Sequence, residues 1–125
     1  MKHLVFIAIG GAGGALARHW LSNLVHDATA SKFPFGTLSV NLLGSFCIGI
    51  LYVVIVERGF VHPDWRSVFI VGFLGAFTTF STFSLESIAL LENGQPAVAL
   101  GYVLLSVVTC ISAVWLSMSL TRFIW

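Results

Sequence analysis

Four long apolar segments, separated by short polar connections, make up most of the chain. They cover about residues 4–24, 35–56, 67–91 and 97–120. Each segment reaches the roughly 20 residues that a helix needs to cross the hydrocarbon of a bilayer. The connections hold most of the charged side chains, and a proline lies at or near the start of the second, third and fourth segments. The pattern predicts an all-α membrane protein with four transmembrane helices, folded as a single domain over residues 1–125.

A polar run inside the third apolar segment differs from a lipid-facing helix. Gly72–Glu86 reads GFLGAFTTFSTFSLE and carries five hydroxyl side chains within seven consecutive positions. Polar groups at membrane depth must find partners or line water, so the run predicts a polar pathway. A single hydroxyl in a transmembrane helix is explained by a hydrogen bond back to its own helix. Five hydroxyls in close succession are not readily explained in this way. The five residues are Thr78, Thr79, Ser81, Thr82 and Ser84.

Two phenylalanines lie within the same run at helical spacing. Phe80 and Phe83 are about one turn apart, so a helix places both rings on one face, with hydroxyls beside them. An aromatic ring attracts cations with its face and anions with its edge, and hydroxyls both donate and accept hydrogen bonds. The run therefore predicts a ladder for a small ion without fixing the sign of its charge. Ordinary apolar packing of the two rings is the alternative.

The same run predicts that the third helix is broken near mid-membrane. Gly75 is followed by Thr78 and Thr79, and glycine and β-branched residues are weak helix formers. A broken helix surrounded by protein exposes carbonyl groups that can coordinate a cation. A close helix crossing at Gly75 explains the glycine equally well.

Five further polar residues are candidates for the pathway or its vestibule. Asn41 has an amide that can donate to an anion or bridge two helices. Tyr102 and Ser106 lie one turn apart on the fourth segment and extend a polar track. Arg18 ends the first segment, where it either attracts anions at a vestibule or extends to the membrane interface. Glu86 is costly if buried and charged, so it is either interfacial or a functional acid.

Composition and charge exclude other functional classes. Of the 125 residues, 58% are hydrophobic and 9% are charged, against about 25% charged in an average soluble domain. The net charge of +1 offers no basic surface for nucleic acid. The four histidines lie near segment ends without metal-ligand spacing, and no catalytic constellation is present. We therefore expect membrane lipid as a partner, no nucleic acid and no enzymatic activity.

The distribution of positive charge predicts an ambivalent orientation in the membrane. Four segments place both termini on one side, with four Lys and Arg residues there against two on the other side. Such a weak bias allows insertion both ways round, and an antiparallel dimer of one sequence reproduces an inverted repeat. Four helices of this length are too few to enclose a hydrated path, so we expect an oligomer.

Three motifs occur in order along the chain: GGAGGALARHW (Gly10–Trp20), GTLSVNLLGS (Gly36–Ser45) and the run Gly72–Glu86. Together with the length and the four segments, they resemble the Fluc family of bacterial fluoride channels. The resemblance implies an antiparallel, dual-topology homodimer in the bacterial inner membrane, with two fluoride pores at the subunit interface. It also implies a function, the passive export of cytoplasmic fluoride, which relieves fluoride toxicity.

The resemblance further implies roles for individual residues. Phe80 and Phe83 would line the pores with ring edges toward fluoride. Polar contacts along the path would come from Asn41, Ser81, Thr82 and Tyr102. A structural sodium ion at the dimer centre would be held by the backbone carbonyls of Gly75 and Thr78 from both subunits. Neutral donors suit this function, because they replace the water that fluoride loses without holding the ion too tightly to release it.

The alternative function is a small four-span antiporter that exchanges protons for drugs or cations. Such a carrier is expected to use a membrane-embedded carboxylate. The first segment has no Asp or Glu, which leaves Glu86 as the only candidate. Saturable, proton-coupled transport that is lost in Glu86→Gln would favour this alternative.

Overall fold

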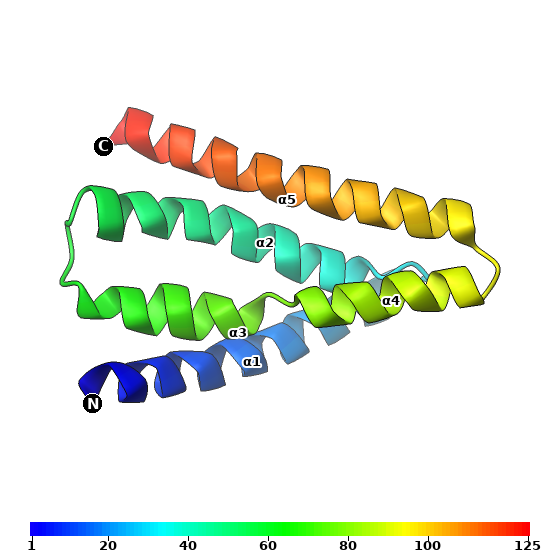
Figure 1. Cartoon of the computed structure of the whole chain (residues 1–125), viewed down its shortest axis with the longest axis horizontal. Coiled ribbons are helices and arrows are strands. Elements are labelled where there is room, and N and C mark those ends of the chain that lie inside the picture. Colours follow the sequence, from blue (N-terminus) through cyan, green and yellow to red (C-terminus); the bar gives the residue numbers. More distant parts are fainter.

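The computed structural model describes residues 1–125 as a bundle of four long helical segments (Figure 1). The first segment is α1 (Lys2–Thr29), and the second is α2 (Phe35–Leu51), which continues into the π-helix η1 (Tyr52–Glu57). The third segment comprises the π-helix η2 (Arg66–Leu74), α3 (Gly75–Phe77) and α4 (Phe80–Glu92). The fourth segment is α5 (Pro96–Ile124). Four helices are long and apolar enough to cross a membrane, and both termini lie at one end of the bundle (Figure 1). The predicted all-α class with four spans is confirmed.

The helices extend beyond the predicted apolar segments at several ends. α1 continues through the polar residues Asn23, His26 and Asp27, because a helix that has left the hydrocarbon tolerates polar side chains on every face. It ends at Thr29: the N–H of the following residue, Ala30, still donates to the His26 carbonyl oxygen at 2.9 Å, and the positive φ of Ala30 (46°) then turns the chain out of the helix. α5 begins at Pro96, which a first helical turn accepts because the N–H there has no partner.

The third segment is interrupted at a pair of threonines, which Figure 1 shows as a thin connection between α3 and α4. Thr78 (φ −79°, ψ 156°) and Thr79 (φ −148°, ψ 115°) are both extended. Gly75 itself is helical, and a Cβ on it would meet nothing closer than the Ile70 carbonyl oxygen at 3.8 Å. The interruption therefore lies just after the glycine, and within the protomer Gly75 makes no close helix crossing.

Close helix crossings occur instead between α1 and η2, where three glycines meet. A Cβ at Gly10 would lie 2.1 Å from the Val68 carbonyl oxygen, and one at Gly72 would lie 2.7 Å from the Ile7 carbonyl oxygen. Gly14 is equally confined. Small residues allow such backbone contact, which is a principal source of helix association in lipid.

We expect Gly14→Ala to destabilise the protein by about 1–3 kcal/mol, the range for overpacking, because the new Cβ would lie 2.1 Å from the Phe73 carbonyl oxygen. Gly101→Ala is the matched control, since a Cβ there meets nothing within 4 Å. The control should be neutral or slightly stabilising, because alanine favours a helix. Thermal unfolding in detergent measures both variants. Equal stability of the two would contradict close packing of α1 on η2.

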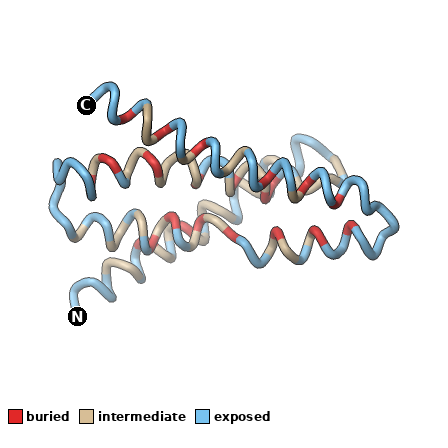
Figure 2. The backbone as a smooth tube through the Cα atoms, turned by 45° about the horizontal axis from the view of Figure 1, so that its top comes forward, coloured by how far each residue is buried: buried red, intermediate tan, exposed pale blue.

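Buried residues line the inside of the bundle, and most of the outer surface is exposed (Figure 2). Only 22 of 125 residues are buried, while large apolar side chains such as Leu16 and Trp115 are exposed, as expected for a chain surrounded by lipid. Two small buried clusters lie on either side of the interruption. They are Val40, Leu74 and Phe77, and Phe83, Leu90, Ala99 and Tyr102. The interruption is thus held between two packed parts of the bundle.

Candidate functional site

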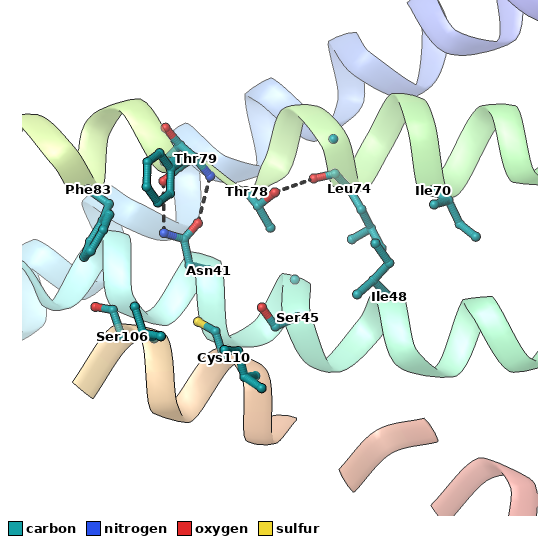
Figure 3. A pocket seen from close by; sticks show the side chains of 15 residues that line it. Asn41, Ser45, Ile48, Ile70, Leu74, Thr78, Thr79, Phe83, Ser106 and Cys110 are labelled. Carbon is teal, nitrogen blue, oxygen red and sulfur yellow. Dashed lines mark hydrogen bonds between the residues drawn. The ribbon is translucent and has the colours of Figure 1, made fainter. Parts of the chain in front are cut away.

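A cavity of about 440 Å³ lies beside the interruption (Figure 3). Its walls come from α2, from the third segment on both sides of the interruption and from α5, and no charged side chain lines it. Its polar side chains belong to Asn41, Ser45, Thr78, Thr79, Ser106 and Cys110. Phe80, Phe83 and Gly75 also line it. The cavity therefore brings together seven of the residues that the sequence singled out, namely Asn41, Gly75, Thr78, Thr79, Phe80, Phe83 and Ser106.

Asn41 braces the extended backbone of the interruption. Its Nδ2 donates to the Thr79 carbonyl oxygen at 3.0 Å, and its Oδ1 accepts from the Thr79 N–H at 2.7 Å (Figure 3). The Thr79 N–H would otherwise bond to the carbonyl of Gly75, four residues earlier in a continuous helix. Asn41 thus bridges two helices, as one sequence interpretation proposed, and its second amide hydrogen is left over for another acceptor.

The five hydroxyls of the run divide into two groups. Thr78 and Ser84 donate back to carbonyls of their own helix, those of Leu74 and Phe80, each at 2.9 Å. The other three cluster where α4 begins: Thr79 Oγ1 accepts from the Thr82 N–H at 3.2 Å and lies 3.0 Å from Thr82 Oγ1 and 3.4 Å from Ser81 Oγ. Thr79 is therefore the N-cap of α4. Ser81 and Thr82 lie beside the cavity wall rather than in it.

Two facing polar stripes run along α2 and α5. On α2, Thr37, Asn41 and Ser45 recur every four residues, and on α5 the same spacing joins Tyr102, Ser106 and Cys110. The Ser106 side chain is only 6% exposed, and its hydroxyl has no hydrogen-bond partner although it lies at the cavity wall (Figure 3). A buried hydroxyl without a partner is costly, so Ser106 is a donor available to a ligand.

The two phenylalanines of the ladder have different environments. Their ring centroids are 5.4 Å apart with an interplanar angle of 51°. Phe80 is 77% exposed, whereas Phe83 is buried and lies 5.2 Å from the ring of Tyr102. Phe83 and Tyr102 thus pack together as part of a core cluster, while Phe80 is left uncovered by its own protomer.

Glu86 lies partly buried at the far side of Tyr102 with both carboxylate oxygens engaged. Oε1 accepts from the Thr37 hydroxyl and Oε2 from the Tyr102 hydroxyl, each at 2.7 Å. The Tyr102 proton is therefore already committed to Glu86. Thr37 was not among the residues predicted from the sequence, although its four-residue spacing from Asn41 was a signal for it. Arg18 lies on α1, which contributes nothing to the cavity, and makes no hydrogen bond or ion pair.

Comparison with known proteins identifies the family. Residues 5–118 match the family described as CrcB-like protein, Camphor Resistance (CrcB). Three relatives are each named fluoride-specific ion channel FluC. The protein from Hahella chejuensis is 49% identical over 99% of this chain and 98% of its own. The protein from Saccharophagus degradans is 52% identical over 93% of this chain and 86% of its own. The protein from Magnetococcus marinus is 46% identical over 97% of this chain and 98% of its own. Because this match extends across all four helices, the chain belongs to the CrcB-like protein family.

Proposed function

We propose that the protein is a fluoride-selective channel that exports cytoplasmic fluoride passively across the bacterial inner membrane and so relieves fluoride toxicity. The carrying observation is the cavity beside the interruption, whose polar groups are all uncharged and include the free hydroxyl of Ser106. A bare anion in a medium of low dielectric is very costly unless donors replace its water. Neutral donors do so without the tight binding that a fixed positive charge would add, and release is needed for conduction. The names of the relatives support fluoride as the ion.

The functional unit in this proposal is an antiparallel homodimer with two pores. Phe80 lines the cavity yet is 77% exposed, so one protomer leaves the path uncovered. A second copy packed against this face would cover Phe80 and complete the walls. The weak Lys and Arg bias between the two sides supports insertion in both orientations. In the completed path, we assign fluoride contacts to Phe80, Phe83, Asn41 and Ser106, with Ser81, Thr82 and Tyr102 beside them.

We also propose a structural sodium ion at the dimer centre, held by the carbonyls of Gly75 and Thr78 from both subunits. The donor set fits, since sodium prefers oxygen ligands and a broken helix offers free carbonyls. The Thr79 N–H donates to Asn41 and leaves the Gly75 carbonyl without its usual helical partner. Thr78 is extended, so its carbonyl lies outside the helical ladder. The bound cation would supply fixed positive charge near the two anion paths.

Efflux from liposomes tests the proposal. The purified protein, reconstituted with fluoride and chloride inside, should release fluoride rapidly and retain chloride, in keeping with the relatives that are named fluoride-specific ion channels. A fluoride electrode and a chloride electrode follow the two ions in one sample. Comparable release of chloride would overturn the proposal. Saturable transport that requires a proton gradient and is lost in Glu86→Gln would instead favour the antiporter.

A further inference from the structure

We propose that the connection between α1 and α2 forms one mouth of the ion path, and that the Lys32 ammonium gathers small hard anions there. For the identity of the ion this inference rests on the proposed function. A second cavity, of about 250 Å³, lies at this connection and is separate from the one beside the interruption. Its walls include Lys32, Phe33 and Glu86.

A continuous series of aromatic rings joins the two cavities. Phe83 lines the first cavity, and its ring lies 5.2 Å from that of Tyr102. Tyr102 in turn meets the edge-on ring of Phe33, a wall of the second cavity, at 5.4 Å and 83°. The ladder of Phe80 and Phe83 therefore continues through Tyr102 to Phe33. A path that passes along this series opens at the second cavity.

The charges of the second cavity explain why a cation is needed there. Glu86 is one of its walls, and a carboxylate at the end of an anion path repels the ion that must pass. Its two hydrogen bonds, from Thr37 and Tyr102, stabilise the charge but do not cancel it. Lys32 lines the same cavity, and its ammonium makes no ion pair with Glu86. An unpaired ammonium offsets the carboxylate and raises the local concentration of anions.

Fluoride flux at low ionic strength and sub-saturating fluoride tests the role of Lys32. In an antiparallel dimer, each compartment faces this mouth in only one of the two pores. Lys32→Gln should therefore lower the flux by less than about half, and Lys32→Glu should come closer to that limit, because the loss or reversal of one charge slows anion entry at that mouth. Lys32→Arg should retain the flux. Lys2→Gln removes the same charge from the opposite end of α1 and should behave as the wild type.

The salt and concentration dependence separates this role from a structural one. A steering charge is screened, so the Lys32→Glu defect should vanish in about 1 M salt, where the Debye length is about 3 Å, and at saturating fluoride. A Lys32→Glu variant with wild-type flux at low ionic strength would overturn the inference, and so would a defect that persists in high salt. Failure of the proposed function would look different, as an absence of selective fluoride flux in the wild-type protein, and would overturn this inference as well.

Discussion

Fluoride flux should fall by at least about tenfold when Phe80 is replaced by isoleucine, which is the effect of about 1.4 kcal/mol on the barrier. Isoleucine keeps much of the bulk of the ring but removes its quadrupole, whose positive edge is the part that attracts an anion. Phe80 is the sharper of the two tests, because at 77% exposed it contributes little to packing within the protomer. Phe83→Ile should lower the flux similarly, with an added loss of stability because that ring packs on Tyr102.

Initial efflux rates from liposomes measure the effect, and size-exclusion chromatography in detergent shows whether the dimer survives. Phe123→Ile is the matched control, because Phe123 is 90% exposed near the end of α5, outside both cavities. The control should conduct as the wild type does. Wild-type flux in both Phe80→Ile and Phe83→Ile would contradict a role in conduction and support the alternative, in which the two rings serve only in apolar packing.

Much of the fold could be predicted because a bilayer imposes a length and a polarity on each helix. Four apolar stretches admit few structures other than four helices, since backbone polar groups in lipid must be satisfied within a helix. The helix ends were less predictable. α1 continues past the apolar segment to Thr29, because polar residues such as Asn23 and His26 stay helical in the interface. Apolar length therefore predicts the part of a helix inside lipid, not where the helix ends.

The site was predictable in its residue types but not in its hydrogen bonds. The density of hydroxyls in Gly72–Glu86 indicated a polar path, yet sequence could not tell which hydroxyls bond back to the helix, as Thr78 and Ser84 do. That distinction depends on where the helix breaks. The partners of Glu86 come from α2 and α5, so they follow from packing between helices rather than from spacing along one of them.

The second large effect is expected from replacing Asn41, whose side chain bonds to the extended backbone at the interruption. Asn41→Leu preserves the size of the side chain but removes both hydrogen bonds to Thr79. Leaving a buried N–H and a buried carbonyl without partners costs about 1–3 kcal/mol each. The cost is larger in lipid, where no water can replace the lost hydrogen-bond partners. We expect either loss of the folded dimer or a rewound helix, in which the Thr79 N–H returns to the Gly75 carbonyl. Fluoride flux should be abolished in both cases.

Thermal unfolding and hydrogen exchange at Thr79 distinguish these two results, since rewinding retains the dimer and changes the protection of that amide. Asn41→Asp is a useful companion, because it keeps the acceptor for the Thr79 N–H, loses the donor and places a negative charge in the anion path; its flux should also be lost. Asn23→Leu is the matched control, because the exposed Asn23 side chain bonds only to His19 on its own helix. If Asn41→Leu conducts fluoride as the control does, the extended backbone does not depend on this side chain, and the Gly75 carbonyl is not kept free by Asn41.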